Sequence, residues 1–439
     1  MLIVFEAGRA MGINRQTYVE KLVKHKHNGL VKVVTGLRRC GKSYLLFNLF
    51  KRHLLSDGVK AEHIVEVALD DDSFERLRDP RELSAYIRKR VGRRRGKTYV
   101  LIDEIQMCEE VPSSVPGSKA TISFYDVLNG LMKLPGIDIY VTGSNSRMLS
   151  KDVATNFRDR GFEIRLHPLS FAEYVEATGK DAPTAFEDYI TWGGLPLAVL
   201  EKDDDERSRY LKGLFERVYI KDICERHGIQ DDYVLNNVVD AVSSSVGSLT
   251  NPHKLVNTLR SVLNVKTNDH VLNSYLCYLC DAFLFSKVLR YDVKGKSYFD
   301  TPHKYFAEDV GLRNARLNFR QVEGDHLMEN VIYNELALRG YNVDVGVVPI
   351  SSRAGGKQSV RQHEIDFVVN LGSKKLYIQS ALSVESAEKR EQETLSLRKS
   401  GDFFRKIVVV GGMKRLARDE SGIEYVGVIP FLLDRTILN

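Results

Sequence analysis

The chain has 439 residues, of which 43% are hydrophobic and 28% charged, and its 64 Lys and Arg outnumber its 58 Asp and Glu by 6. This composition is that of an ordinary globular protein and points to no special class. The net charge is too small to indicate a nucleic-acid partner by itself, so any basic surface must be local. At about 150 residues per domain, the length suggests three domains.

The 5 cysteines are scattered along the chain and odd in number, which fits free thiols in a reducing compartment. Cys277 and Cys280 form a C-x-x-C in an apolar periodic stretch, and we expect core cysteines because no second pair follows at zinc-site spacing. No apolar run reaches about 18 residues, and the start of the chain lacks a signal-peptide pattern. A cytoplasmic protein without membrane contact is therefore expected.

The first chemical motif lies in residues 31–50, VKVVTGLRRCGKSYLLFNLF. Gly36, Gly41, Lys42 and Ser43 have the spacing of a phosphate-binding P-loop, G-x-x-x-x-G-K-[ST]. Glycines let successive N–H groups face one phosphate, the lysine reaches the β- and γ-phosphates, and the serine ligates Mg²⁺. A chance glycine-rich turn is the alternative. The expected nucleotide-binding residues are Gly36, Arg38, Arg39, Cys40, Gly41, Lys42, Ser43 and Tyr44.

The elements around this loop are those that the motif requires. Residues 30–35 form a β-branched run typical of a buried strand, and residues 43–53 predict an apolar helix. Residues 64–70 alternate apolar and acidic side chains and predict a second strand. A helix is expected at 80–90, followed by a dense run of cations at 88–97. That run is either a solvated connector or a contact to nucleic-acid phosphates.

The second chemical motif is TYVLIDEIQ, residues 98–106. Its apolar residues predict a buried strand that delivers Asp103 and Glu104 to the carboxyl end, where open α/β sheets bind ligands. This is the Walker B pattern, in which Asp103 holds the Mg²⁺ hydration shell and Glu104 orients the attacking water. Two acids after a strand are commonly surface residues, but here they follow a complete P-loop by about sixty residues.

A further strand is expected at 137–146 and ends in polar residues. Thr142, Ser144 and Asn145 are candidates for a sensor of the γ-phosphate or of the attacking water, because a neutral amide or hydroxyl contacts phosphate without a change of charge. We select Asn145 as the catalytic sensor. A simple turn is the alternative.

Two arginines precede the last strand expected in this segment, residues 162–166. Arg158 or Arg160 would reach the γ-phosphate of a neighbouring subunit as an arginine finger, which is worth roughly 10³ to 10⁵ in rate. We select Arg160, although the sequence does not decide between the two. A surface ion pair is the alternative.

The order of these motifs resembles the AAA+ superfamily, and more narrowly a prokaryotic group of P-loop ATPases with a C-terminal domain of unknown function. The stretches that carry the resemblance are TGLRRCGKS (35–43), VLIDEIQ (100–106), VTGSNS (141–146), RGFEIRLHPLSFAEY (160–174), YITWGGLP (189–196), YLKGLFERVYIKDICER (210–226) and HEIDF (363–367). The resemblance implies a three-layer α/β ATPase core with ATP and Mg²⁺ as cofactors. Asp159 stands where the group usually has glycine, and WGGLP lacks the arginine that many AAA+ proteins use as a second sensor.

Four segments follow from these patterns. They are an AAA+ P-loop core at 11–167, a helical lid at 168–209, a winged-helix-like segment at 210–303 and a restriction-endonuclease-like α/β domain at 304–439. The winged-helix resemblance rests on helices followed by a hairpin with Gly295 at its turn, and such folds bind DNA or protein. A recognition surface or a solvated face would be formed by His253, Lys254, Arg260, Lys266 and Asn268.

The nuclease-like resemblance rests on a helix at 324–340 and strands at 363–370 and 375–381. That core needs acidic metal ligands on the first strand, then an acid and a lysine two positions apart on the next. Asp366 fits the first position. The other two positions are occupied by Gln379 and Ala381, so we expect a nuclease-like fold without cleavage activity.

Together these patterns predict an Mg²⁺-dependent ATPase that drives a conformational change in a homo-oligomer acting on DNA. The oligomer would be a ring or another arrangement, and the patterns identify no protein partner. The basic run, the winged-helix-like segment and the nuclease-like tail carry the DNA expectation. The alternative is a nucleotide-dependent switch or scaffold between proteins. A third interpretation is an active metal-dependent nuclease, which would depend on Asp366.

Overall fold

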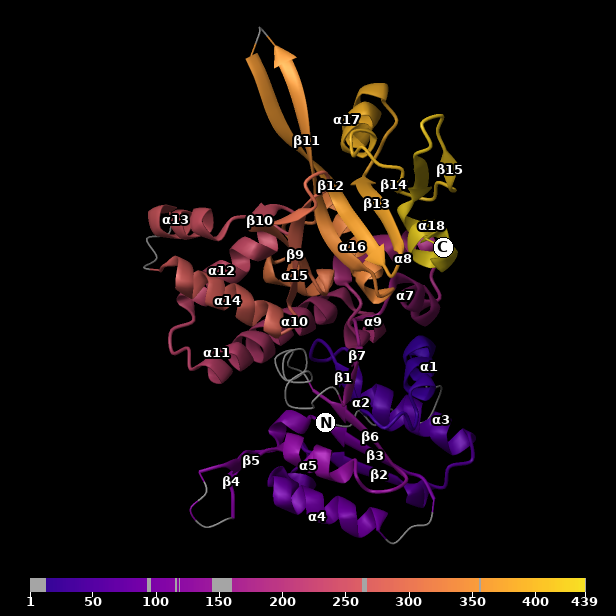
Figure 1. Ribbon diagram of the computed structural model, residues 1–439, viewed down its shortest axis with the longest axis vertical. Coiled ribbons are helices and arrows are strands. Elements are labelled where there is room, and N and C mark those ends of the chain that lie inside the picture. Colours follow the sequence, from indigo (N-terminus) through magenta and orange to yellow (C-terminus); the bar gives the residue numbers. More distant parts are fainter. Residues whose placement is uncertain are drawn as a thin grey trace. The chain divides into compact units, whose positions relative to one another are not determined.

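The computed structural model describes residues 13–92, 96–114, 117, 119–143, 160–262, 267–354 and 357–438. It divides into two compact units (Figure 1). The first unit runs to His167 and includes Asp281–Phe283, and the second consists of Pro168–Cys280 and the chain from Leu284 onward. The expected α/β class is confirmed, because a parallel sheet lies in the first unit and a mixed sheet in the second.

Within the described residues, the first unit is built on five parallel strands in the order β2-β3-β6-β1-β7. They are β1 (Val31–Thr35), β2 (Ile64–Ala68), β3 (Thr98–Asp103), β6 (Ile137–Thr142) and β7 (Gly161–Arg165), and a separate short pair is formed by β4 (Val111–Pro112) and β5 (Thr121–Ile122). The five strands lie where the sequence predicts them. β1 and β3 are buried along their whole length, which matches their apolar sequences and the position of parallel strands between layers of helices.

The predicted P-loop helix is present from Lys42 to Ser56, with a π-helical stretch in its middle. The helices of this unit are α1 (Gln16–Lys24), α2 (Lys42–Tyr44), η1 (Leu45–Phe50), α3 (Lys51–Ser56), η2 (Ala61–His63), η3 (Asp72–Arg78), α4 (Pro80–Val91), η4 (Ile105–Met107) and α5 (Phe124–Leu131). α4 begins at a proline preceded by the capping residue Asp79, as helix-start rules require. Leu83 of α4 and Leu128 of α5 belong to the same buried core as the strands.

Parallel pairing brings three strand ends to one edge of this sheet. β1 lies beside β6 with Val34 opposite Thr142, and β6 lies beside β3. Thr35, Asp103 and Thr142 are the last residues of these strands. Ligands bind at this carboxyl edge in open α/β sheets, so the fold gathers the predicted motifs where a ligand site is expected.

Within the described residues, the second unit contains a mixed sheet of nine strands in the order β15-β16-β14-β13-β12-β11-β9-β10-β8. The strands are β8 (Leu249–Thr250), β9 (Phe285–Asp292), β10 (Ser297–Ala307), β11 (Asn342–Ala354), β12 (Lys357–Leu371), β13 (Lys374–Ala381), β14 (Arg405–Val410), β15 (Ala417–Arg418) and β16 (Glu424–Gly427). The strands predicted at 363–370 and 375–381 are present within β12 and β13.

The predicted hairpin is formed by β9 and β10, but it belongs to this large sheet. β9 pairs in parallel with β11, with Arg290 opposite Val345. The predicted boundary between residues 303 and 304 therefore falls inside β10. Local sequence carries no signal for this pairing, because its partners are far apart in the chain.

The second unit is also rich in helices. They are α7 (Phe171–Thr178), α8 (Ala182–Trp192), α9 (Pro196–Leu200), α10 (Asp204–Leu214), η5 (Phe215–Ile220), α11 (Lys221–His227), α12 (Tyr233–Ser244), α13 (Pro252–Val262), α14 (Asp269–Asp281), α15 (Val310–Arg316), α16 (Gly324–Leu338), α17 (Ala387–Arg398), α18 (Val428–Leu433) and η6 (Arg435–Leu438). The predicted helix at 324–340 is α16. The predicted boundary between residues 209 and 210 falls inside α10.

The WGGLP stretch joins α8 to α15 by close packing. A Cβ at Gly193 would lie 2.3 Å from Asp309 Oδ1, and Gly194 N donates to Asp309 Oδ2 at 2.7 Å. A Cβ at Gly311 would lie 2.0 Å from the carbonyl oxygen of Trp192. The glycines of this motif are therefore explained by contacts within the second unit.

The expectation of core cysteines is wrong for the C-x-x-C pair. On α14, Cys277 is exposed and Cys280 is half-buried, because the helical period turns Leu272, Leu276 and Leu279 inward instead. No helix among the described residues is long and apolar enough to span a membrane.

Candidate functional site

The P-loop requires glycine at two positions. Gly36 has φ +133° and Gly41 has φ +98°, conformations that residues with a side chain rarely adopt. At Gly36 there is also no space, since a Cβ would lie 2.0 Å from the carbonyl oxygen of Leu166. Arg39 between them also has a positive φ, +65°. The chain is thus held in a tight turn directly after β1.

Lys42 points back into this turn. The residue is 4% exposed, and Nζ donates to the carbonyl oxygens of Gly36 and Leu37, each at 3.0 Å. The loop therefore holds the ammonium on its own carbonyl oxygens, at the start of the helix whose N–H groups a P-loop turns toward phosphate.

The remaining predicted nucleotide-binding side chains differ in accessibility. Arg39 is exposed, whereas Arg38 and Tyr44 are half-buried. Cys40 is fully buried, and its Sγ lies 3.5 Å from the carbonyl oxygen of Leu166. The Cys40 side chain therefore packs in the core, and any contact to a ligand would come from its backbone.

Hydrogen bonds connect the P-loop, β3 and β6. Asp103 is 3% exposed and accepts a hydrogen bond from the hydroxyl of Thr142, and the Ser43 hydroxyl lies close enough to lower the pKa of Asp103. Thr142 Oγ1 in turn accepts from the backbone N of Glu104 at 2.8 Å. The structure thus brings the predicted Walker A serine together with the predicted Walker B pair. Thr142, at the end of β6, is the link between them.

The environment of Asp103 favours an added cation. Burial raises the pKa of Asp103, and the hydroxyls of Ser43 and Thr142 act against that shift. Glu104 and Asp70 raise the pKa further. A carboxylate whose charge is opposed by burial and by other acids is stabilised when a cation binds beside it.

Glu104 leaves β3 in a left-handed backbone conformation, with φ +48°. Residues other than glycine seldom adopt this region, and those that do are enriched at functional sites. The Glu104 carboxylate accepts a hydrogen bond from Gln106 Nε2. Sequence reasoning did not select Gln106 as a site residue, although it stands two positions after Glu104 and could have been considered for that reason.

Three predicted residues, Ser144, Asn145 and Arg158, lie outside the described residues. Arg160 is exposed and directly precedes β7, where its carbonyl oxygen accepts from Val31 N at 2.9 Å. Because β7 is parallel to β1, this position is at the amino end of the strands. The structure therefore does not bring Arg160 to the P-loop of its own chain.

These residues fit a magnesium ion and a nucleotide phosphate. Ser43 and Asp103 offer the hard oxygen ligands that Mg²⁺ takes. The glycine turn and Lys42 offer N–H groups and a positive charge for phosphate. The donor set and the glycine conformations of the loop therefore match both groups.

A second group of charged side chains surrounds Lys304 of β10. Lys304 is 3% exposed, and its Nζ lies 2.8 Å from Glu329 Oε1 and 2.5 Å from Glu364 Oε1. Asp366 Oδ1 is 3.8 Å from the same nitrogen. α16 and β12 therefore direct three carboxylates at one ammonium from β10.

Asp366 and its neighbours are further connected to β13 and α17. Asp366 Oδ2 accepts from Ser380 N at 2.8 Å, and Asp366 N donates to Gln379 Oε1 at 3.3 Å. Gln379 Nε2 donates to Glu393 at 3.3 Å. Gln379 stands where a nuclease would have an acid. Its neutral amide accepts a hydrogen bond from the backbone of Asp366 and donates one to the Glu393 carboxylate.

Burial dominates the electrostatics of this cluster. It raises the pKa of Glu329 to about 8 and that of Asp366 to about 6, and Lys304 acts against both shifts. Burial lowers the pKa of Lys304, but Glu329, Asp366 and Glu364 together raise it above its ordinary value. Lys304 is therefore protonated, and its single positive charge interacts with all three carboxylates.

Sequence reasoning missed Lys304 altogether. The lysine is supplied by β10, which precedes the nuclease-like strands by about sixty residues and pairs into their sheet through β9. Glu364 could have been found, because it stands two positions before Asp366 and so shares its face of the strand.

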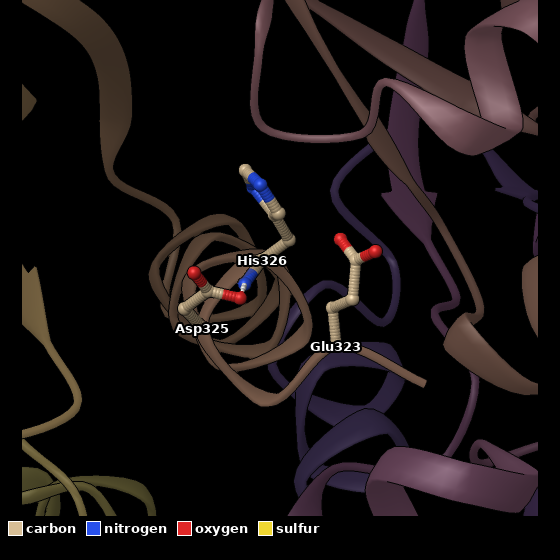
Figure 2. A group of neighbouring side chains, drawn as sticks. All are labelled: Glu323, Asp325 and His326. Carbon is tan, nitrogen blue, oxygen red and sulfur yellow. Dashed lines mark hydrogen bonds between the residues drawn. The ribbon is translucent and has the colours of Figure 1, made fainter. Parts of the chain in front are cut away.

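At the start of α16, Glu323, Asp325 and His326 form a group that Figure 2 shows in close-up. Their ligand atoms lie within 4.8 Å of one another, and both carboxylates are exposed. Asp325 Oδ1 accepts from His326 N at 2.9 Å. Acids at the amino end of a helix are stabilised by its dipole, so this group is explained without a metal.

The predicted recognition surface is only partly described. His253, Lys254, Arg260 and Asn268 are exposed, and Lys266 lies outside the described residues. His253 lies 3.2 Å from Asp269, so this face carries both signs of charge.

Comparison with known families gives two matches. Residues 28–175 match a family described as an AAA domain, and this range contains the P-loop, β3 and β6. Residues 183–323 match a domain of unknown function, DUF8612, which ends immediately before α16. The chain thus contains an AAA-type P-loop domain.

Two curated relatives match nearly the whole chain. An uncharacterized protein of Haemophilus influenzae is 32% identical over 427 residues, which is 96% of this chain and 98% of that protein. An uncharacterized protein of Methanocaldococcus jannaschii is 25% identical over 405 residues, covering 88% and 81% of the two chains. The chain belongs to the family of the Haemophilus influenzae protein.

Solved structures resemble the chain more distantly. The Walker-type ATPase of Pyrococcus abyssi has a TM-score of 0.47 and 15% identity, covering 70% of this chain and 96% of that one. The ORC2 protein of Aeropyrum pernix has a TM-score of 0.36 and 13% identity, covering 69% and 93%. Similarities at this level do not identify a function.

Proposed function

We propose that the chain is an Mg²⁺-dependent ATP hydrolase. The observation that carries this proposal is the hydrogen-bonded group of Asp103, Thr142 and Glu104 at the carboxyl edge of the parallel sheet, with the P-loop residue Ser43 close enough to lower the pKa of Asp103. Phosphoryl transfer needs these residue types: a hydroxyl and a carboxylate to hold Mg²⁺, and a further residue to position the attacking water.

Each residue has a separate task in this proposal. Ser43 and Asp103 would hold Mg²⁺, which when bound neutralises charge on the phosphates. Lys42 would exchange its two carbonyl partners for phosphate oxygens, and the loop amides would bind the same anion. Glu104 would orient the attacking water and accept its proton, once its carboxylate is released from Gln106.

The ATP affinity of the Lys42→Ala variant tests whether the P-loop is the nucleotide-binding site. A charged contact of this kind is worth about 1.5–3 kcal/mol, so we expect ATP affinity to fall roughly ten- to a hundredfold in titration calorimetry. Lys51→Ala is the matched control, because Lys51 lies on the same helix but pairs with Glu66 at 2.6 Å. If Lys42→Ala bound ATP as tightly as the control, the loop would not be the nucleotide site.

We further propose that the active form is a homo-oligomer that acts on DNA. The exposed cations Arg88, Lys89 and Arg90 at the end of α4 support a phosphate contact. The position of Arg160 away from its own P-loop supports a role at the site of a neighbouring subunit. The alternative, a nucleotide switch between proteins, predicts no change in ATP turnover when duplex DNA is added at low salt.

The carboxylate cluster around Lys304 is proposed to be a nuclease-like site without cleavage activity. Its three carboxylates are already directed at a buried ammonium, and Ala381 offers no second lysine. Incubation of plasmid DNA with the protein and Mn²⁺ should produce no nicks. Nicking that disappears in Asp366→Asn would contradict this proposal and leave the ATPase proposal intact.

A further inference from the structure

β11 and β12 continue well beyond the rest of their sheet, as Figure 1 shows. They pair with each other from Asn342 opposite Asn370 to Ala354 opposite Lys357. β9 reaches β11 only as far as Val347, and β13 pairs with β12 only from residue 367 onward. Among the described residues, the segments 349–354 and 357–362 therefore pair only with each other; we call these two segments the arm.

The arm is a two-stranded ribbon of considerable length. Six residues per strand at about 3.3 Å each give a projection of about 20 Å. Most of its described side chains are open to solvent, with Ser351, Ser359, Arg361 and Gln362 exposed and Val360 60% exposed, whereas Ile350 at its base is half-buried against the core of the sheet. A two-stranded ribbon with so many exposed side chains is only marginally stable in water, so a partner that covers it would add stability.

All charged residues in the arm are positively charged. No Asp or Glu occurs between residues 349 and 363, whereas Arg353, Lys357 and Arg361 are cations. In the backbone register, these three stand opposite Gln358, Ala354 and Ile350. The charges are therefore spread along the ribbon with no carboxylate within it to neutralise them.

The base of the arm is fixed to the turn between β9 and β10, which is also basic. Lys294 Nζ donates to the carbonyl oxygen of Pro349 at 3.1 Å, and Arg290 donates to Gln362 Oε1 at 3.0 Å. Lys296 follows in the same turn and is exposed. The acid of this turn, Asp292, accepts from the backbone N of Lys294 at 3.0 Å. The positive charge of the arm thus continues onto its support.

We propose that the arm is a duplex-DNA-binding element that lies in the major groove. A ribbon of two strands fits the groove of B-form DNA, which is about 12 Å wide, and does not fit the narrow major groove of A-form RNA. Phosphates on both sides of the groove match cations spread along the ribbon. Pairing of two arms from two copies is disfavoured, because like charges would meet at the edge. This inference rests on the proposed action on DNA.

Fluorescence anisotropy with a labelled duplex, titrated over a range of salt, tests the arm. The test variant is Arg353→Gln/Lys357→Gln/Arg361→Gln. The matched control is Lys374→Gln/Lys389→Gln/Lys399→Gln, which removes three exposed cations from elsewhere in the same unit. We expect the test variant to bind duplex DNA about tenfold or more weakly near 0.1 M salt and to lose up to about 2.7 from the salt slope, whereas the control binds like wild type.

Dimethyl sulfate footprinting tests whether the arm lies in the major groove, because this reagent methylates guanine N7, which faces that groove. Wild type should protect N7 within its binding site, and the test variant should not. Basal ATP turnover and thermal melting should be the same in both, because the arm is not part of the nucleotide site.

The outcomes separate the two proposals. Equal DNA affinity of the test variant and the control would overturn the arm inference alone. Equal binding of duplex RNA and duplex DNA by wild type would overturn the groove assignment. No DNA binding by wild type at low salt would overturn the proposed DNA partner, and the arm inference with it, while ATP turnover would remain a separate result.

Discussion

Gly36 is the residue on which the geometry of the P-loop depends most directly. Its φ of +133° is a conformation that glycine adopts readily and other residues rarely adopt. A Cβ at this position would lie 2.0 Å from the carbonyl oxygen of Leu166, the residue that follows β7. The loop is therefore shaped by its contact with the neighbouring strand as well as by its own spacing.

Gly36→Ala is predicted to destabilise the first unit by more than about 2 kcal/mol, because backbone strain and a steric clash add together. Urea denaturation measures the change. Gly29→Ala is the matched control, since Gly29 also has a positive φ, +78°, but nothing lies within 4 Å of its Cβ position. That control should cost about 1–2 kcal/mol. Equal losses in the two variants would show that the contact with Leu166 has no effect.

At the scale of elements, β10 supplies the cation that the nuclease-like strands lack. The hairpin β9–β10 pairs with β11, and this pairing places Lys304 among carboxylates from α16 and β12. Two buried acids, Glu329 and Asp366, beside the half-buried Glu364 would be very unfavourable in a folded core without a cation. The lysine therefore stabilises the joint between the hairpin and the rest of the sheet.

Lys304→Met is predicted to lower the free energy of unfolding by about 3–5 kcal/mol, because it leaves buried carboxylates without their partner. Chemical denaturation at about pH 9, where Glu329 with its pKa of about 8 is ionised, measures the loss. The double variant Lys304→Met/Glu329→Gln should lose less than Lys304→Met alone, since one of the stranded charges is gone. Wild-type stability of Lys304→Met would contradict the role given to this lysine.

The same cluster predicts a dependence of stability on pH. The pKa of Glu329 is raised from 4.5 to about 8, so the folded state holds a proton that the unfolded state releases between these values. The contribution of Glu329 is therefore fully present below about pH 4.5 and is lost as pH rises toward about 8, by up to about 1.4 kcal/mol per pH unit.

Denaturation at several pH values tests this sign. Glu329→Gln cannot titrate, so its stability should fall less steeply with rising pH than that of wild type. Glu388→Gln, which changes an exposed glutamate of α17, should follow wild type. A steeper fall in Glu329→Gln than in wild type would refute the assignment.

At the scale of the whole molecule, the position of Arg160 requires a second subunit if this arginine acts in catalysis. Arg160 precedes β7 at the amino end of the strands, five residues from the carboxyl edge in the register with β1. That separation is about 16 Å at the usual rise per residue, which is too far for the side chain to reach its own P-loop.

Mixing inactive variants tests such a shared site. Lys42→Ala and Arg160→Ala are each predicted to have low ATP turnover. Their mixture should recover part of the wild-type rate, because some neighbouring pairs contain one intact P-loop and one intact arginine. A mixture that shows only the sum of the separate rates would exclude a finger acting between subunits.

The parts of the fold that were predictable from sequence depend on local signals. The five strands of the first unit follow from short apolar runs, and the P-loop turn follows from glycines at fixed spacing. Thr142 was predicted as a candidate sensor from its place at a strand end, but its hydrogen bonds to Asp103 and Glu104 join segments far apart in the chain. Lys304 was missed for the same reason, because residue spacing does not reveal such long-range contacts. The arm was also missed, because its strands look ordinary until the extent of their neighbours is known.

Mg²⁺-dependent phosphate release shows most directly whether Glu104 orients the water that attacks ATP. Glu104→Gln is predicted to bind ATP like wild type but to turn it over at least about a hundredfold more slowly. Glu109→Gln, which changes an exposed acid of the same segment, should keep the wild-type rate. Wild-type turnover by Glu104→Gln would contradict the account.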